Sequence, residues 1–129
     1  MSKKVLLCED HPINAQIALA MLEKLNASAV LAQNGEEGVK LFSDSGVGEF
    51  SAVLMDLNMP VMNGFEAAEA IRALDRVDAK TVPIIALSAS NDPEDIGKAL
   101  EAGMDTHILK PLDPKALAKM LCLDLPSGK

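Results

Sequence analysis

The chain has 129 residues, of which 49% are hydrophobic and 24% are charged, and this composition is ordinary for one globular domain. We therefore expect a single domain over residues 1–129, with its core at about residues 4–122. The net charge is -7, from 19 acidic and 12 basic residues. Because an acidic surface repels phosphate backbones, nucleic acid is not expected to be a partner of this chain alone.

The two cysteines and the N-terminus predict where the protein resides. Cys8 and Cys122 lie far apart in apolar stretches, which is typical of small buried residues in a reducing compartment rather than of a disulfide. Only four apolar residues follow Lys4, too few for a signal peptide or a membrane span. A cytoplasmic location without membrane attachment is therefore predicted.

Five short apolar runs predict β-strands. They are unbroken rather than alternating, which is typical of a parallel sheet that is covered on both faces. The runs are residues 5–8, 29–32, 52–55, 84–87 and, more briefly, 107–109.

Helical patterns lie between the apolar runs. Apolar residues recur at helical spacing over residues 13–25, 39–42, 67–74, 96–100 and 117–121. Asp92-Pro93 and Asp113-Pro114 are each typical of a helix N-cap followed by proline. This repeated alternation predicts a doubly wound α/β domain with a parallel sheet. Residues 43–49 are expected to form a surface loop without a phosphate-binding role, and residues 75–80 a solvated helix end and loop.

Reactive side chains follow four of the five predicted strands. Glu9 and Asp10 follow the first strand, Asp56 the third, Ser88 the fourth and Lys110 the fifth. Polar residues often end strands, so a single position carries little weight. However, in an open α/β sheet the carboxyl ends of the strands form the site, and the set as a whole therefore predicts one.

The charges at this edge predict a metal site. Two carboxylates about 4 Å apart repel each other by roughly 4 kcal/mol at an effective dielectric constant near 20. Glu9, Asp10 and Asp56 outnumber Lys110, so protonation or a cation must relieve the imbalance, and hard oxygen ligands suit Mg²⁺. Asp56 is then a candidate nucleophile that forms an aspartyl phosphate. Lys110 and Mg²⁺ would offset the phosphoryl charge, and Ser88 would donate a hydrogen bond to it.

Five short motifs carry a resemblance to a known family. They are Leu7-Cys8-Glu9-Asp10, Met55-Asp56-Leu57-Asn58-Met59-Pro60-Val61-Met62-Asn63-Gly64, Ile84-Ile85-Ala86-Leu87-Ser88-Ala89, Ala102-Gly103-Met104-Asp105 and Lys110-Pro111. With these motifs in this order, the chain resembles the receiver domain of two-component response regulators. The resemblance implies a flavodoxin-like (βα)5 fold with strand order 2-1-3-4-5.

The resemblance also implies a metal site and its ligands. Asp56 matches the phosphoacceptor, and Asp10 matches the acid that binds Mg²⁺ directly. Glu9 matches the acid that acts mostly through water. Asn58 holds the position whose backbone carbonyl is a metal ligand and whose N–H meets the phosphoryl group.

Four further positions complete the implied switch. Ser88 matches the hydroxyl residue that senses the phosphoryl group, and Lys110 matches the lysine that pairs with it. Pro111 is expected to follow a cis peptide bond. His107 stands where the family usually has Tyr or Phe, so its role in coupling phosphorylation to the output face is a hypothesis.

The function implied by the resemblance is signalling rather than enzymatic turnover of a substrate. A histidine kinase or a histidine phosphotransfer domain would donate the phosphoryl group, and a downstream effector or output domain would respond. The segments 11–14 and 102–105 resemble receivers of hybrid sensor kinases or phosphorelays.

Two alternatives remain at this point. A haloacid-dehalogenase-type phosphatase uses similar groups, but it needs an acid where this chain has Asn58. A pseudo-receiver that binds partners without phosphorylation is disfavoured by the complete set of Glu9, Asp10, Asp56 and Lys110, with Ser88 beside them.

Overall fold

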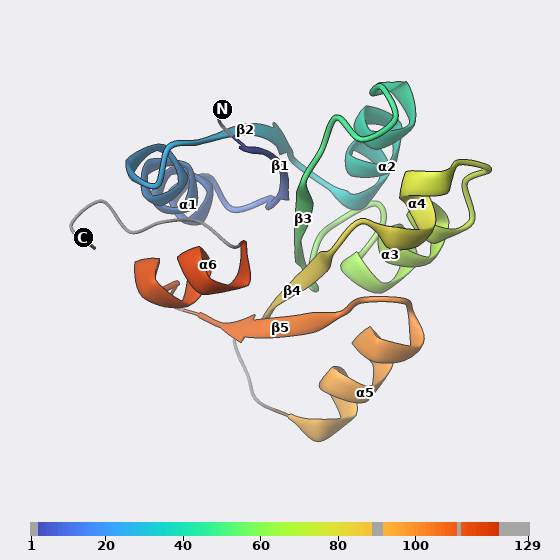
Figure 1. The fold of residues 1–129 in the computed structure, drawn as a ribbon. Coiled ribbons are helices and arrows are strands. Elements are labelled where there is room, and N and C mark those ends of the chain that lie inside the picture. The colour runs from blue at the N-terminus through green and yellow to red at the C-terminus, as the bar shows by residue number, and fades with distance from the viewer. Residues whose placement is uncertain (1–2, 89–91, 111, 122–129) are drawn as a thin grey trace.

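The computed structural model describes residues 3–88, 92–110 and 112–121. Five parallel strands form one sheet in the order β2-β1-β3-β4-β5, which confirms the flavodoxin-like strand order 2-1-3-4-5 (Figure 1). Each strand covers its predicted apolar run, and each end agrees within two residues. The strands are β1 (Lys3–Cys8), β2 (Ala27–Ala32), β3 (Ala52–Asp56), β4 (Ile84–Ser88) and β5 (Thr106–Leu109).

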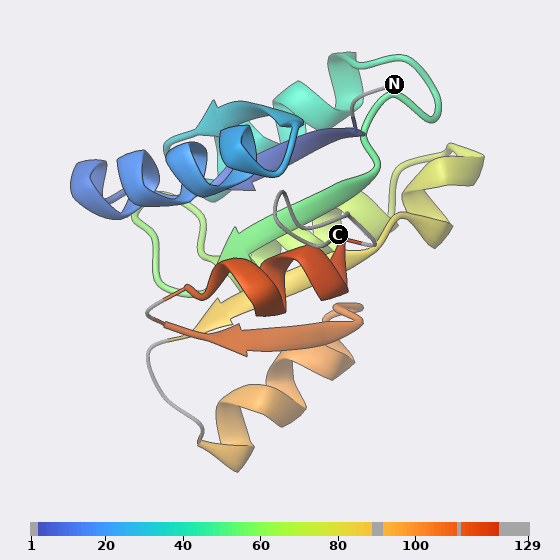
Figure 2. The ribbon, with the colours of Figure 1, turned by 60° about the vertical axis from the view of Figure 1, so that its left-hand side comes forward.

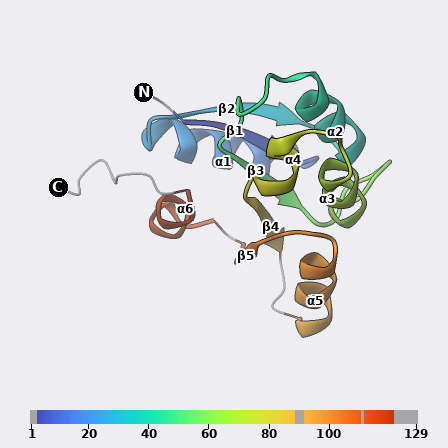
Figure 3. The same ribbon diagram turned by 45° about the vertical axis from the view of Figure 1, so that its right-hand side comes forward.

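Helices cover both faces of the sheet. Figures 1 and 3 show α1 and α6 on one face and α2, α3 and α5 on the other. None of the helices in the described residues is both long and apolar enough to cross a bilayer. The helices are α1 (Pro12–Lys24), α2 (Gly35–Asp44), α3 (Gly64–Arg72), α4 (Val77–Thr81), α5 (Pro93–Glu101) and α6 (Pro114–Met120).

The two-sided cover explains why the strands are apolar without alternation. Every residue of β3 and β4 is buried. In β1, Val5 and Leu7 pack into the cluster beneath α1 and α6, whereas Leu6 and Cys8 pack into the cluster beneath α2 and α3. Successive side chains point to opposite faces, so both sets must be hydrophobic.

The segment after α3 differs from the prediction. Residues 75–80 were expected to be a solvated helix end and loop, but residues 77–81 form the short helix α4. The Arg76 and Asp78 side chains are only 15% and 12% exposed, and they form an ion pair at 2.8 Å. The Arg76 guanidinium also donates, over 2.8 to 3.2 Å, to the main-chain carbonyl oxygens of Phe42, Ser43, Ser45 and Gly46.

The loop predicted at residues 43–49 is confirmed for residues 45–49, whereas residues 43 and 44 belong to a helix. Helix α2 continues through Asp44, and the Arg76 guanidinium satisfies carbonyl groups at its C-terminal end that have no partner within the helix. Asp78 accepts a hydrogen bond of 2.8 Å from the N–H of Gly48, which ties the loop to α4. Side chains distant in the sequence therefore hold the loop in place.

We expect Arg76→Lys to lower the melting temperature of the domain by several degrees, although the charge is kept. A lysine ammonium is a point donor and cannot replace a planar guanidinium that bonds a carboxylate and several carbonyls together. Thermal unfolding followed by circular dichroism measures the effect. An unchanged melting temperature would show that the carbonyl contacts contribute little to stability.

Candidate functional site

The predicted site residues lie along one edge of the sheet. Figure 2 shows that the strands run in one direction, so their carboxyl ends meet at the same edge. Glu9 and Asp10 follow β1, Asp56 ends β3, Ser88 ends β4 and Lys110 follows β5. The parallel topology therefore gathers side chains that are up to about a hundred positions apart in sequence.

Three carboxylates form a compact acidic cluster. One oxygen from each of Glu9, Asp10 and Asp56 lies within 4.8 Å of the others. Glu9 and Asp56 are 3% and 6% exposed, whereas Asp10 is exposed. Several hard oxygen ligands at the mouth of a site, with room left for water, fit Mg²⁺. The chemistry of this donor set therefore matches the predicted metal.

The ammonium group of Lys110 neutralises part of this charge. Its Nζ lies 2.9 Å from Glu9 Oε1 and 3.4 Å from Asp56 Oδ1. The backbone N–H of Lys110 donates to the carbonyl oxygen of Ser88 at 2.8 Å. This bond continues the pairing of β4 with β5 by one residue and aims the lysine side chain at the acidic cluster.

The unequal charges shift two pKa values. Burial raises the pKa of Asp56 to about 6, and the charge of Glu9 adds to the rise while that of Lys110 opposes it. For Lys110, burial alone would lower the pKa, but the hydrogen bond to Glu9 and the charge of Asp56 raise it above its ordinary value. Without a metal, the site therefore favours a charged lysine and a partly protonated aspartate near pH 6.

The loop from β3 to α3 is held tightly against the site. The side chain of Asn63 accepts from the N–H of Glu66, and the Glu66 carboxylate accepts from the N–H of Asn63, which is a capping box. A Cβ atom at Gly64 would lie 2.4 Å from the carbonyl oxygen of Asp56, so only glycine fits there. The N–H of Asn58 donates to Asp56 Oδ1 at 3.4 Å. The loop therefore turns back beside the proposed phosphoacceptor.

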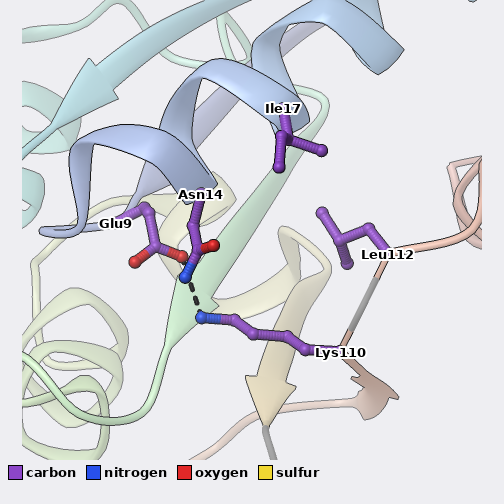
Figure 4. Close-up of a pocket in the computed structure, with 5 residues that line it drawn as sticks. All are labelled: Glu9, Asn14, Ile17, Lys110 and Leu112. Carbon is purple, nitrogen blue, oxygen red and sulfur yellow. Dashed lines mark hydrogen bonds and ion pairs between the residues drawn. The ribbon is translucent and has the colours of Figure 1, made fainter.

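Asn14 is a site neighbour that the sequence reasoning missed. A small pocket of about 60 Å³ beside the cluster is lined by Glu9, Asn14, Ile17, Lys110 and Leu112. Figure 4 shows the polar ends of Asn14, Glu9 and Lys110 directed toward one another, with Ile17 and Leu112 beyond them. Asn14 lies in the first turn of α1, shortly after Glu9 and Asp10, and no sequence pattern indicated its place.

Two further predictions concern β5 and the residue after it. His107 is half-buried and pairs with Ala86 of β4, on the face opposite to Ile108 and α6. It does not belong to the acidic cluster, and its switching role stays a prediction. Pro111, with its expected cis peptide bond, lies outside the described residues, as does Cys122.

Comparison with known proteins identifies the family. Residues 5–122 match the response regulator receiver domain. The chain is 38% identical over 120 residues to the two-component response regulator ORR41 of Oryza sativa subsp. japonica, covering 92% of this chain and 91% of that protein. The chain therefore belongs to the receiver domain family of two-component phosphorelay systems.

Solved structures of receiver domains share this fold. The receiver domain of sensor histidine kinase PA1611 from Pseudomonas aeruginosa, which has a magnesium ion coordinated in its active-site cleft, is 33% identical with a TM-score of 0.84. That match covers 94% of this chain and 95% of PA1611's domain. The receiver domain of Ssk1 from Saccharomyces cerevisiae, crystallised with the histidine phosphotransfer protein Ypd1, is 34% identical with a TM-score of 0.80. That match covers 93% of this chain and 86% of the other.

Some relatives are much longer than this chain. Hybrid signal transduction histidine kinases I and G of Dictyostelium discoideum are 31% and 40% identical over 92% and 88% of this chain. The chain spans only 7% and 3% of their lengths. These proteins therefore contain a receiver-like segment within a much larger whole.

We expect the metal-free domain to lose stability relative to its Asp56→Asn variant as the pH rises. Because the folded state raises the pKa of Asp56 to about 6, this group's contribution is fully present below its unfolded pKa of about 3.8 and is lost as the pH rises through 6. The loss should be on the order of 1 kcal/mol in the free energy of unfolding. Urea titrations at pH 4 to 8 measure it, and added Mg²⁺ should reverse it at pH 7. Parallel pH profiles for the two proteins would contradict this prediction.

Proposed function

We propose that the domain accepts a phosphoryl group from a phosphohistidine on the carboxylate of Asp56, with bound Mg²⁺, and then changes conformation to control a partner. The observation that carries the proposal is the meeting of Asp56 with two other acids and Lys110 at the carboxyl edge of the sheet. Phosphoryl transfer needs mainly positioning and charge neutralisation, and these groups supply both.

In this proposal, residues of the chain itself carry out the transfer. An Asp56 carboxylate oxygen forms the new bond to phosphorus as the phosphorus–nitrogen bond of the phosphohistidine breaks, and the imidazole leaves with that electron pair. The ammonium of Lys110, already 3.4 Å from Asp56 Oδ1, lies where it can pair with the phosphoryl oxygens. We propose that the hydroxyl of Ser88 and the N–H of Asn58 donate to the same oxygens.

The proposed metal ligands are the acids of the cluster and one carbonyl group. Asp10 and Asp56 would bind Mg²⁺ directly, Glu9 would act mostly through water, and the backbone carbonyl of Asn58 would complete the protein's share. Bound Mg²⁺ would offset the charge that develops on the transferred group. The magnesium-containing receiver domain of PA1611 supports this proposal.

A histidine phosphotransfer domain or a histidine kinase is the proposed donor. Ile13 and Ile17 of α1 are 65% and 48% exposed, and Ile17 also lines the pocket beside Glu9 and Lys110. Exposed isoleucines that border a reaction site are suited to contact with another protein. The complex of Ypd1 with the Ssk1 receiver supports this class of partner.

The remaining proposals concern the setting of the domain. We infer that it acts in the cytoplasm and that its phosphorylated form is read by an effector or output domain. Residues 1–129 form a single receiver unit in this proposal, whether it works alone or within a longer hybrid kinase. His107 on β5 is proposed to take part in the switch, in the place that an aromatic residue usually holds.

Intact-mass measurement tests the proposed function. We expect acetyl phosphate with Mg²⁺ to add about 80 Da, which is the mass of one phosphoryl group, and EDTA to prevent the addition. Acetyl phosphate needs no protein donor, so the test does not depend on knowing the partner. Absence of the adduct in the presence of Mg²⁺ would favour the pseudo-receiver alternative, and steady release of phosphate from many phosphomonoesters would favour the phosphatase.

A further inference from the structure

The loop between β3 and α3 contains a strained valine. Val61 has a φ of +70°, in the left-handed region that side chains branched at Cβ rarely adopt. The N–H of Met62 donates to the carbonyl oxygen of Pro60 at 2.7 Å and so closes a tight three-residue turn around Val61. Glycine or asparagine would adopt this backbone conformation with less strain.

Contacts on both sides prevent the turn from relaxing. The carbonyl oxygen of Met62 accepts from the N–H of Gly35, at the start of α2, at 2.9 Å. A Cβ atom at Gly35 would lie 2.3 Å from that oxygen, so the two segments are in direct contact. Met59 is 9% exposed and belongs to the core, and Met62 packs against the core. With its neighbours held inward, Val61 is directed outward and is 74% exposed.

The position of Val61 indicates what would cover it. Asp56 is only 6% exposed, so a protein that delivers a phosphoryl group to it must cover the loops around it. Val61 lies in one of these loops, five residues after Asp56. The loop leads to α3, on the opposite face of the sheet from α1 with its exposed Ile13. Val61 and Ile13 therefore border the site from two sides.

We propose that Val61 is an apolar contact for the phosphodonor domain, which the strained turn holds outward at the rim of the site opposite to α1. The inference rests on the proposed function and adds a second side to the donor interface. Contacts on both sides of Asp56 would restrict how the donor's phosphohistidine can approach. A protein with contacts at α1 alone could pivot about that helix, whereas two separated contacts set its orientation.

Three substitutions at Val61 separate the apolar contact from the strain. Val61→Asn removes the apolar surface and relieves the strain. Val61→Thr replaces one methyl group by a hydroxyl group and keeps the branched shape, and Val61→Ile keeps the apolar surface. The probe is phosphorylated Ypd1 of Saccharomyces cerevisiae, and phosphotransfer rates are measured beside labelling by acetyl phosphate. We expect the Asn and Thr variants to accept from Ypd1 at least about tenfold more slowly, and the Ile variant to match the wild type. Only Val61→Asn should raise the melting temperature.

Several outcomes would overturn the inference. Transfer to the Asn and Thr variants at the wild-type rate would show that Val61 is not a contact. Equal losses with acetyl phosphate would place the effect in the chemistry of Asp56, and a loss in the Asn variant alone would assign it to the backbone. Wild-type protein that is labelled by acetyl phosphate but not by Ypd1 would count against this donor surface. Failure of both labels would instead count against the proposed function.

Discussion

Replacing Asp56 with asparagine is expected to abolish the gain of about 80 Da that acetyl phosphate and Mg²⁺ produce. A carboxamide oxygen is a poor nucleophile. The surroundings of the other two acids of the cluster differ from those of Asp56. Glu9 is paired with Lys110 at 2.9 Å, and Asp10 is exposed. Intact-mass spectrometry of both proteins under the same conditions measures the effect. The loss of labelling should be complete within the detection limit.

The control for this prediction is Asp44→Asn. Asp44 is an exposed aspartate at the end of α2 with a side chain that is 64% exposed, and this variant should be labelled like the wild type. Circular dichroism should show that Asp56→Asn keeps its fold, because the amide has nearly the shape of the carboxyl group. A labelled Asp56→Asn protein would mean that another group accepts the phosphoryl group, and peptide mapping would then locate it.

Replacing Lys110 with alanine is expected to lower the stability of the metal-free domain at neutral pH by about 3 kcal/mol. Among the described residues, Lys110 is the cation that forms ion pairs with Glu9 and Asp56. Its removal leaves the carboxylate of Glu9, on a side chain that is 2% exposed, beside a like charge with no positive partner. The loss should shrink toward pH 5, because protonation of Asp56, whose pKa is raised to about 6, removes the repulsion.

Urea unfolding at pH 5 and pH 8, with and without Mg²⁺, measures this effect. Lys115→Ala, which removes an exposed lysine of α6, is the control and should change stability by less than about 0.5 kcal/mol. We also expect Lys110→Ala to lose the conformational response to a phosphoryl mimic while keeping its fold. An unchanged spectral response would contradict the proposed role, and a stability loss independent of pH would assign the effect to packing.

The alternating order of strands and helices could be predicted from the sequence because both faces of this sheet are covered. Burial on two sides requires unbroken apolar strands, and such runs are visible in one dimension. The position of the site could also be predicted. Parallel strands place all of their carboxyl ends at one edge, so the residues that follow the runs must meet there.

The predicted identities of the site residues had a similar basis. Glu9 and Asp56 are charged residues at the ends of buried strands. Because an unpaired charge is costly there, a charge at such a position in the sequence indicates a site. The roles assigned to single residues came from the family resemblance, however. The switching role of His107 was of this kind, and its position on β5 beside Ala86 leaves that role to be tested.

The tertiary structure alone decided the features that depend on contacts between distant segments. Arg76 was expected to be solvated, but its guanidinium donates hydrogen bonds to carbonyl groups more than thirty positions earlier in the chain. The composition of the residues around Arg76 does not indicate such partners. Likewise, the backbone of Val61 is strained only because Gly35 and the core hold its neighbours. Hydrophobic periodicity is a local consequence of burial and can be read along the chain. The partners of a guanidinium or a turn, in contrast, depend on which distant segments the fold brings beside it.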